Sequence, residues 1–367
     1  MLHGELGVRQ RLEESENSLS RFALKSVDTK GRDHEESKCD FRTDFQRDRD
    51  RIVHSKAFRR IKHKTQVFIA PKGDHYVTRL THTLEVSQIA RSISRALNLN
   101  EDLTEAIALG HDVGHTPFGH IGEDELGKLI PEGFRHNKQS VRIFERLEKD
   151  GNGLNLTWEV RHGILHHSKP RGDFLSGTDE IRLSLEAQTV RISDAIAYLN
   201  HDLADAVRAS VIKESDLPAD INEILGNRHS ERINTMISDI VLNSWDCSGL
   251  TDFQGIPLIT MSESVRKAVN ILREYMFQNV YLPEDDSLEG HTARDIINVL
   301  FNYYTANKDA IPEEYKLRSE TSSKAVIDYI SGMTDNYAIM IAEKLSPGIS
   351  KVFNNRLLNF SDNNLIP

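Results

Sequence analysis

The sequence of 367 residues has little cysteine and no long hydrophobic run. Its two cysteines, Cys39 and Cys247, lie far apart without CxxC spacing, so neither a disulfide framework nor a thiolate zinc site is indicated. No stretch approaches the roughly 18 apolar residues that cross a bilayer, and the first residues lack the apolar segment of a secretion signal. We therefore expect a cytoplasmic protein that is not inserted in a membrane.

An excess of basic charge is also missing. The chain has 46 Lys and Arg against 56 Asp and Glu, a net charge of −10, which argues against constitutive coating of nucleic acid. Residues 42–64 reverse this balance, with nine basic residues against three acidic ones. This segment could receive an anionic ligand or could be a solvated helix face, and both interpretations stay open. The Walker A pattern GxxxxGK[ST] is absent, which excludes a P-loop NTPase.

Strand-like alternation is nearly absent, and apolar residues recur instead at helical spacing. The predicted helices span residues 81–97, 102–113, 139–149, 156–167, 179–208, 231–242, 262–278, 292–307, 324–335 and 336–345. The only β excursion we expect is a short hairpin over residues 65–78, with Pro71 and Gly73 at its turn. The sequence therefore predicts an all-α protein with one small β-hairpin.

The polar stretch 246–255 is the only candidate domain boundary, and no internal repeat is visible. We expect an N-terminal extension over residues 1–50 that packs on the core, a catalytic domain over residues 51–245, and a C-terminal helical region over residues 246–367. Twelve of the sixteen histidines lie between residues 54 and 201. Chemistry is therefore expected in the central domain.

An adjacent pair, His111 and Asp112, stands at a predicted helix end, with His82 upstream and Asp194 downstream. Two imidazoles and two carboxylates suit Mn²⁺, Mg²⁺, Fe²⁺ or Co²⁺ with open positions for water and a phosphate oxygen, rather than a closed zinc site. A His-Asp pair alone could be a helix cap or a surface pair. All four residues lie on or at the ends of predicted helices, as a metal site in a helical bundle requires.

The strings around these residues, RLTHTLEV and ALGHDVGHTPFGHIGEDEL, resemble the HD-domain phosphohydrolase superfamily. Further strings resemble its deoxyguanosine triphosphate triphosphohydrolase-like branch, namely LSRFALKSVDTKGRDHEE, RTDFQRDRDRIVHSKAFRRIKHKTQVF, LTWEVRHGILHHS and VIDYISGMTDNYA. This resemblance covers nearly the whole chain. It implies an HD-domain helical bundle with additional C-terminal helices, and a divalent metal held by His82, His111, Asp112 and Asp194.

The resemblance also implies an activity. The expected reaction is hydrolysis of dGTP or other dNTPs to the deoxynucleoside and inorganic triphosphate. Mn²⁺ or Mg²⁺ is the expected ion, with Fe²⁺ or Co²⁺ as alternatives, because such a ligand set tolerates several ions. Family members form symmetric oligomers and some are activated by nucleotides. A homo-oligomer is therefore expected, with an allosteric nucleotide or single-stranded DNA as a further candidate partner.

Three residues follow the His-Asp pair closely. His120 and Glu123 are three residues apart and share a face if a helix begins near Phe118. A carboxylate beside an imidazole fixes its tautomer and raises its pKa, as a proton donor to a leaving alkoxide requires. The resemblance implies that this pair transfers the proton at the scissile bond and that His115 contacts phosphate. Loop packing is the alternative interpretation of His115 and His120.

A polar stripe marks the helix expected over residues 179–208, where Asp194, Tyr198 and Asp202 recur at four-residue intervals. The resemblance implies that Tyr198 lies near the deoxyribose and that Asp202 binds its 3′-hydroxyl. An aromatic ring under C2′ leaves no room for a ribose 2′-hydroxyl, and burying that group without a partner costs about 1–3 kcal/mol.

Three further residues complete the predicted site. Arg79 precedes His82 by three residues and can reach an α-phosphate. By resemblance, Gln66 contacts the sugar or base, and His136 lies near the phosphates. The alternatives that stay open are a surface charge for Arg79, a hairpin hydrogen bond for Gln66 and a helix cap for His136. The remaining histidines of the central domain receive no role: His54, His63, His75, His162, His166, His167 and His201.

Two other functions stay open. Another HD-type enzyme, such as a 5′-nucleotidase or a cyclic-nucleotide phosphodiesterase, would share the metal set without needing Tyr198 and Asp202. A regulator that binds nucleotides or single-stranded DNA would instead use the basic segment, residues 42–64. No motif specifies the preferred base.

Overall fold

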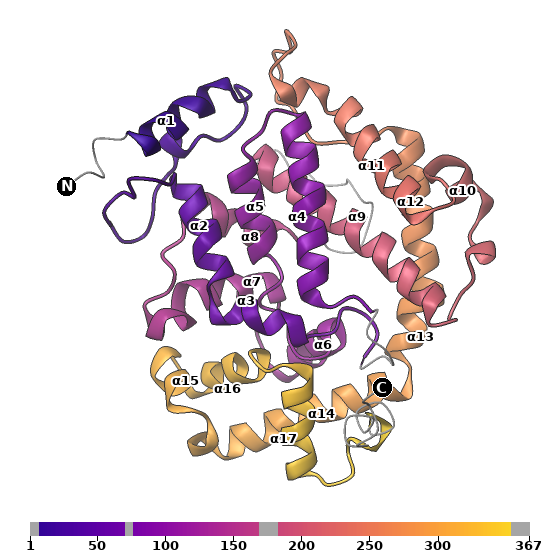
Figure 1. The fold of residues 1–367 in the computed structure, drawn as a ribbon. Coiled ribbons are helices and arrows are strands. Elements are labelled where there is room, and N and C mark those ends of the chain that lie inside the picture. The colour runs from indigo at the N-terminus through magenta and orange to yellow at the C-terminus, as the bar shows by residue number, and fades with distance from the viewer. Residues whose placement is uncertain (1–6, 70–75, 169–182, 354–367) are drawn as a thin grey trace, which may run out of the picture.

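The computed structural model describes residues 7–69, 76–168 and 183–353, and the regular structure of these residues is helical (Figure 1). In chain order the helices are α1 (Val8–Ser15), α2 (Asp44–Val53), α3 (Lys56–Arg60), α4 (Arg79–Ala96), α5 (Glu101–Gly110), α6 (Gly119–Leu129), α7 (His136–Arg142), α8 (Trp158–His166), α9 (Leu185–Arg208), α10 (Ala219–Leu225), α11 (His229–Asn243), α12 (Glu263–Met276), α13 (Leu282–Asp285), α14 (Leu288–Ala306), α15 (Glu313–Arg318), α16 (Ser322–Ser331) and α17 (Asp335–Leu345). Two π-helical segments, Ile143–Leu147 and Phe277–Tyr281, continue α7 and α12. The all-α prediction is confirmed.

The β excursion is smaller than the sequence predicts. Among the described residues it is a single antiparallel bridge between Thr65 and Thr78. The expected turn residues, Pro71 and Gly73, lie outside the described residues. The bridge joins the two ends of this excursion directly before α4.

The three helices that carry most of the predicted site begin with side-chain caps. Thr78, Asn100 and Ser184 each accept a hydrogen bond from the backbone N–H three residues further on, at the starts of α4, α5 and α9. Helix α4 packs against both α5 and α9, and the three lie side by side at the centre of the molecule (Figure 1). Residues far apart in sequence therefore meet along α4.

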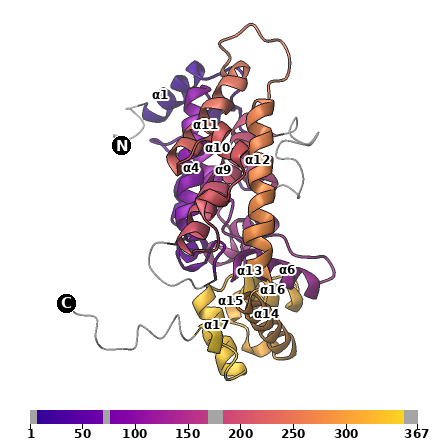
Figure 2. The ribbon, with the colours of Figure 1, turned by 90° about the vertical axis from the view of Figure 1, so that its right-hand side faces the viewer.

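The buried apolar side chains form two clusters. The first is built by α2 to α5 and α8 to α12, and the second by α6 and α14 to α17. Helices α14 to α17 lie at one end of the elongated molecule (Figure 2). Residues 246–255 lie within the connection from α11 to α12, and the domain limits expected from the sequence stay predictions. Within the described part of the chain, no helix is both long and apolar enough to cross a membrane.

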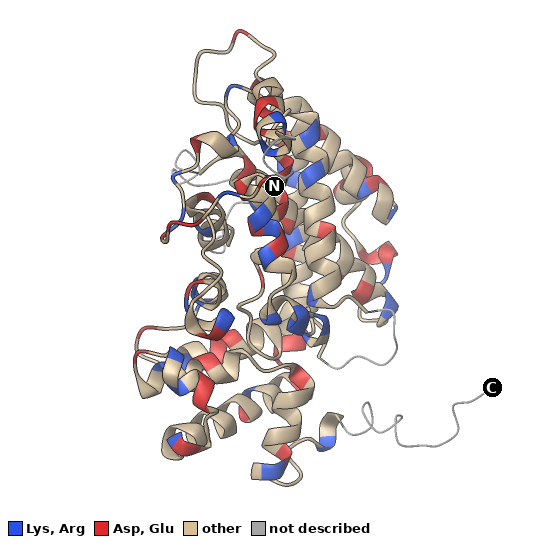
Figure 3. Ribbon diagram, turned by 60° about the vertical axis from the view of Figure 1, so that its left-hand side comes forward, with Lys and Arg blue, Asp and Glu red and all other residues tan. Residues whose placement is uncertain are grey.

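The basic segment, residues 42–64, is largely compensated by acidic side chains. Arg51 lies 2.7 Å from Glu36, and Arg42 lies 2.6 Å from Asp50. Basic and acidic residues are interspersed over the ribbon (Figure 3). Because four of its six arginines have carboxylate partners, the local excess of positive charge is smaller in the fold than in the sequence.

Candidate metal centre and active site

The loop after α5 is held by a close approach of α7. Ser140 Oγ donates to the backbone oxygen of His111, at 2.7 Å, and accepts from the backbone N–H of Gly114, at 2.9 Å. A Cβ at Gly114 would lie 2.3 Å from the backbone oxygen of His136. Only glycine therefore allows α7 to bring His136 beside the His111-Asp112 pair.

The four predicted metal ligands converge from three elements. His82 comes from α4, His111 and Asp112 from the end of α5, and Asp194 from α9. His82 Nε2 lies 3.1 Å from Asp194 Oδ1 and 3.7 Å from Asp112 Oδ2, and His111 Nε2 lies 3.4 Å from Asp112 Oδ1. Neighbouring ligands of an octahedral ion with bonds of about 2.1 Å are spaced at about 3 Å. The structure thus brings together the whole predicted set.

The chemistry of this set fits a divalent cation. His111 Nε2 is buried and has no hydrogen-bond partner within the described residues. Its Nδ1 lies 2.6 Å from the backbone oxygen of Ala108, so the free lone pair is on Nε2 and points into the site. A buried polar atom without a partner is costly. A bound cation would satisfy it, so the residues present fit the group that the sequence predicts.

The protonation states also suit a cation. Burial opposes ionisation of Asp112, but the neighbouring His111 and Arg79 outweigh it and hold the pKa of this carboxyl well below its usual range. Burial of Asp194 is likewise outweighed by its hydrogen bond with His82, and its pKa falls to about 2. Burial lowers the pKa of His82. Charged carboxylates and neutral imidazoles are the forms that bind divalent ions.

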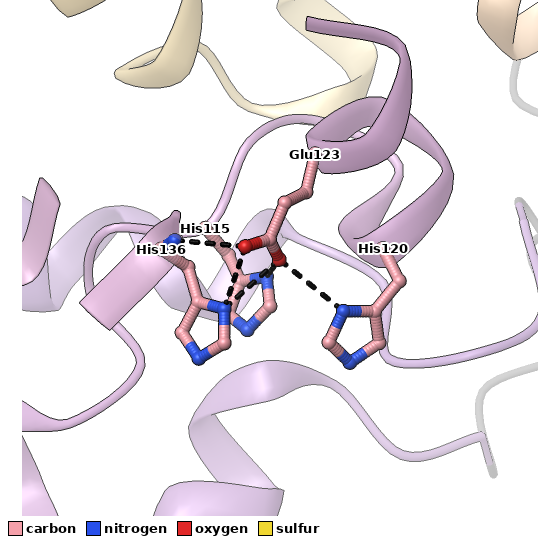
Figure 4. A group of neighbouring side chains, drawn as sticks. All are labelled: His115, His120, Glu123 and His136. Carbon is pink, nitrogen blue, oxygen red and sulfur yellow. Dashed lines mark hydrogen bonds and ion pairs between the residues drawn. The ribbon is translucent and has the colours of Figure 1, made fainter. Parts of the chain in front are cut away.

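A second group gathers around Glu123 of α6 (Figure 4). Its carboxylate lies 2.9 Å from His136 Nδ1, 3.2 Å from His120 Nδ1 and 3.6 Å from His115 Nδ1. The rings of His115 and His136 stack with centroids 3.9 Å apart. Helix α6 begins at Gly119, so the predicted His120–Glu123 pair forms as expected. The structure adds His136 to the same carboxylate.

The two histidines that contact Glu123 differ in exposure. The side chain of His120 is 70% exposed, whereas His136 is buried. Burial raises the pKa of Glu123, but His136 and His120 outweigh it and hold this pKa well below its usual range. The Glu123 carboxylate beside the exposed His120 imidazole raises the pKa of His120. A raised pKa is what we expect of a histidine that donates a proton to the leaving group.

Arg79 and Gln66 lie together at the edge of the metal set. Arg79 Nη1 donates to Asp112 Oδ2 at 2.7 Å, and its Nε and Nη2 are buried without a partner among the described residues. Gln66 Oε1 is also buried and has no hydrogen-bond partner among the described residues. Gly119 has a φ of +58°, and a Cβ there would lie 2.8 Å from Arg79 Nη2. Buried donors of this kind require an acceptor, which a phosphate can supply.

The stripe on α9 is present, and its last residue is anchored from two sides. Asp202 Oδ2 accepts a hydrogen bond from Tyr281 Oη at 2.8 Å, and Asp202 Oδ1 lies 2.8 Å from His201 Nδ1. Tyr198 is partly buried against the first apolar cluster, and burial raises its pKa. The structure therefore places Tyr198 and Asp202 on the helix that also supplies Asp194.

Sequence reasoning missed two histidines of the site. His201 Nε2 lies 2.8 Å from His82 Nδ1, and His167 Nε2 lies 3.7 Å from Asp112 Oδ1. The helical spacing of both residues could have predicted that they face the site. His201 follows Asp194 by seven residues, and His167 follows the buried Ile164 by three. Residues at these spacings lie on the same face of a helix, so His201 is expected on the face of Asp194 and His167 on the face of Ile164.

Comparison with known proteins agrees with this geometry. Residues 79–199 match the HD domain family, and residues 259–344 match a phosphohydrolase-associated domain. The first match contains all four predicted metal ligands, and both matches lie in the helical fold described above. The fold and the site thus define an HD-domain protein.

Curated relatives extend this likeness over most of the chain. Three proteins described as deoxyguanosinetriphosphate triphosphohydrolase-like are similar to it. The relative from Caldanaerobacter subterraneus subsp. tengcongensis is 53% identical over 91% of this chain and 94% of its own. Those from Clostridium tetani and Desulfatibacillum aliphaticivorans are 47% and 46% identical over 92% of this chain, and over 95% and 97% of their own. The chain belongs to the deoxyguanosinetriphosphate triphosphohydrolase-like family.

Proposed function

We propose that the protein is a metal-dependent dNTP triphosphohydrolase, which hydrolyses dGTP or other dNTPs to the deoxynucleoside and inorganic triphosphate. The observation that carries this proposal is the convergence of His82, His111, Asp112 and Asp194 beside the unpartnered guanidinium nitrogens of Arg79. The names of the relatives support the same reaction.

The four ligands would hold Mn²⁺ or Mg²⁺, with Fe²⁺ or Co²⁺ as alternatives. When bound, such an ion polarises a phosphate oxygen and acidifies a water. Arg79 would neutralise the α-phosphate through Nε and Nη2, and His115 would contact the phosphates. With their protons on Nδ1, His82 and His111 would direct their Nε2 lone pairs into the site.

Proton transfer to the departing 5′ oxygen would come from a histidine held by Glu123. His120 is our first candidate, since Glu123 raises its pKa and it is open to a ligand. His136 is the second candidate, because it makes the shorter contact with Glu123 and is buried. Replacing each by glutamine separates them: the proton donor is the residue whose loss removes the alkaline limb of the pH–kcat profile.

Tyr198 and Asp202 would select deoxyribose. We expect Tyr198→Ala to reduce the preference for dGTP over GTP in kcat/KM by about 5- to 150-fold, the equivalent of 1–3 kcal/mol. Tyr198→Phe keeps the ring and should keep the preference. Another HD-type hydrolase would retain its activity and its sugar preference in both variants.

The deciding experiment supplies the protein with each dNTP and with GTP, in Mn²⁺ and separately in Mg²⁺, and resolves the phosphate products by chromatography. His111→Ala serves as the inactive variant, and His166→Ala, at an exposed histidine, as the matched control. Triphosphate from dNTPs but not from GTP supports the proposal. Release of pyrophosphate or monophosphate would assign the site to another HD-type reaction.

Other features stay predictions at this point: the cytoplasm as its location, a homo-oligomer as its assembly, and an allosteric nucleotide or single-stranded DNA as an additional ligand. The location is supported by Cys39 and Cys247, which are both free thiols in the fold.

A further inference from the structure

One part of the sequence resemblance has no role in the proposed reaction, the string VIDYISGMTDNYA at residues 326–338. It covers the second half of α16, a short connection and the first residues of α17. Two carboxylates of this segment, Asp328 and Asp335, are buried. A buried charge is costly unless it is paired and hydrogen-bonded, so the partners of these two groups indicate what the segment holds in place.

Asp328 connects α16 to α7. Its side chain has no exposed surface. Asp328 Oδ1 accepts hydrogen bonds from Gln139 Nε2 at 2.9 Å and from Arg142 Nε at 2.8 Å, and Oδ2 accepts one from Arg142 Nη2 at 2.7 Å. Ser319 Oγ also donates to Oδ2 at 2.7 Å. A bidentate contact between a guanidinium and a carboxylate fixes orientation as well as distance, so this contact sets the position of α7 relative to α16.

Helix α7 begins at His136, the buried histidine of the group around Glu123. His136 N donates to Glu123 Oε1 at 2.9 Å, and His136 Nδ1 lies 2.9 Å from Glu123 Oε2. Gln139 and Arg142 stand three and six residues further along the same seven-residue helix. Because a helix of about two turns moves as a unit, a shift of α7 at these two residues would also move His136 relative to Glu123.

The group around Glu123 lies where the two apolar clusters meet. The apolar residues of α6, which carries Glu123, belong to the second cluster together with those of α14 to α17. The buried apolar residues that continue α7 belong to the first cluster, as do those of the helices that carry the metal ligands. Asp335 accepts from Phe118 N, directly before α6, at 3.1 Å. Asp328 thus joins α7 to the part of the core that holds Glu123.

We infer that Asp328 is a positioning residue for proton transfer in the proposed reaction. By holding α7 in place, it keeps His136 against Glu123. His136 needs this position whether it donates the proton itself or orients Glu123 toward His120. This inference rests on the proposed function and deepens it. Asp328 acts through α7 and not on the substrate, but displacing a catalytic group by about 1 Å can cost about 100-fold in rate.

The test uses two substrates that differ in their need for a proton. The first is the dNTP that the product assay finds to be hydrolysed fastest, whose 5′ oxygen leaves as an alkoxide and must be protonated. The second is its analogue with sulfur in place of the bridging 5′ oxygen, which leaves as a stable thiolate. A variant that misplaces the proton donor therefore slows the first substrate and spares the second.

Asp328→Asn keeps the size of the side chain but removes its charge and one acceptor oxygen. We expect kcat for the dNTP to fall about 10- to 100-fold. The kcat for the sulfur analogue, the KM values and the Mn²⁺ dissociation constant should stay within a few-fold of the wild type. Glu320→Ala removes the exposed partner of the same Arg142 and should leave both rates unchanged. An equal loss of rate on both substrates, or no loss on either, would overturn the inference.

Two measurements do not depend on the reaction. Thermal unfolding establishes that Asp328→Asn is folded. If it is not, Gln139→Ala removes one of the contacts from the side of α7 and should give the same pattern. Hydrogen–deuterium exchange, detected by mass spectrometry, should be faster over residues 136–147 in the folded variant and unchanged over residues 79–96 of α4. Unchanged exchange over residues 136–147 would overturn the inference.

These outcomes also separate the inference from the proposed function. Triphosphate release by the wild type, with unchanged kinetics in Asp328→Asn, would reject the role of Asp328 alone. Faster exchange in α7 without triphosphate release from any dNTP would reject the proposed reaction alone and leave Asp328 as the residue that positions α7.

Discussion

His201 connects the candidate metal ligand His82 with the carboxylate of Asp202. For His82 to offer Nε2 to a cation, its proton must be on Nδ1, which faces His201 Nε2 at 2.8 Å. His201 must then carry its own proton on Nδ1, which faces Asp202 Oδ1 at 2.8 Å. Tyr281 supplies a hydrogen bond to the other oxygen of Asp202. The carboxylate of Asp202 thus ends this chain of contacts, although His201 Nδ1 lies outside hydrogen-bond geometry toward it.

This arrangement predicts a role for His201 in metal affinity. We expect His201→Ala to weaken Mn²⁺ binding about 10- to 100-fold, the usual effect of removing a partner of a metal-binding histidine. His201→Gln offers both an acceptor and a donor and should stay within a few-fold of the wild type. Isothermal titration of the metal-free protein with Mn²⁺ gives the dissociation constants. An unchanged constant in His201→Ala would mean that His201 only fills space.

Helix α17 also contacts the loop between α5 and α6 that carries His115. At its first residue, Asp335 accepts hydrogen bonds from Thr65 N at 2.9 Å, from Thr65 Oγ1 at 2.7 Å and from Phe118 N at 3.1 Å. Nearby, the buried Lys64 donates to the backbone oxygens of His115 and Ser331. The C-terminal helices thus hold the second half of the loop that carries His115, directly at Phe118 and through Lys64 at His115.

Removing this carboxylate should be costly. Asp335→Ala leaves three donors unpaired and a buried ammonium at Lys64 without a nearby counter-charge, so we expect a loss of about 3 kcal/mol in the free energy of unfolding. The matched variant Asp295→Ala, at an exposed position of α14, should stay within about 0.5 kcal/mol. Urea denaturation compares the two. Equal stability of both variants would contradict the role given to Asp335.

The first turn of α9 contains a buried carboxyl group that joins it to the N-terminal segment. Glu186 is fully buried and accepts hydrogen bonds from the backbone N–H groups of Leu24 and Asn100, at 3.1 and 3.2 Å. Burial raises its pKa from 4.5 to about 7. The folded state therefore holds a proton between about pH 4.5 and 7 that the unfolded chain has released.

Stability should consequently fall as pH rises through this window. The loss reaches about 3 kcal/mol above pH 7, on the scale of 1.36 kcal/mol per pKa unit. Glu186→Gln cannot ionise, so it should be more stable than the wild type at pH 8 and equally stable at pH 4.5. Denaturation of both proteins from pH 4.5 to 8 measures the difference. A difference that does not change with pH would contradict this assignment.

Across the whole molecule, the proposed metal ligands tie three central helices together. Their residues span positions 82 to 194, and they meet only when α4, α5 and α9 are packed. A cation therefore binds the folded state in preference to the unfolded chain. Such binding stabilises a protein by about 2.7 kcal/mol when the free ion is at 100 times its dissociation constant.

We expect Mn²⁺ at this excess to raise the melting temperature of the wild type by a few degrees, and a chelator to reverse the change. His111→Ala should show no rise, whereas His166→Ala should respond like the wild type. Differential scanning calorimetry with and without Mn²⁺ provides the measurement. An equal rise in His111→Ala would locate the stabilising ion elsewhere.

The sequence alone determined the helical class, the position of most long helices and the predicted residues that share one helix face. These features depend on local spacing: Asp194, Tyr198 and Asp202 align because an α-helix repeats every 3.6 residues. The apolar spacing did not predict helix α2, because charged residues dominate its sequence. Only a few of its side chains, among them Phe45 and Ile52, form an apolar face. The resemblance then supplied roles that spacing could not.

Only the tertiary structure decided which of these faces meet. The contacts of His82 with His201, of His136 with His167 and of Asp335 with Thr65 span 119, 31 and 270 residues. No periodicity reports such contacts, because they depend on how helices pack and on where a close approach such as that at Gly114 is sterically allowed. The sequence therefore specified the side chains of the site, while helix packing selected which of them face one another.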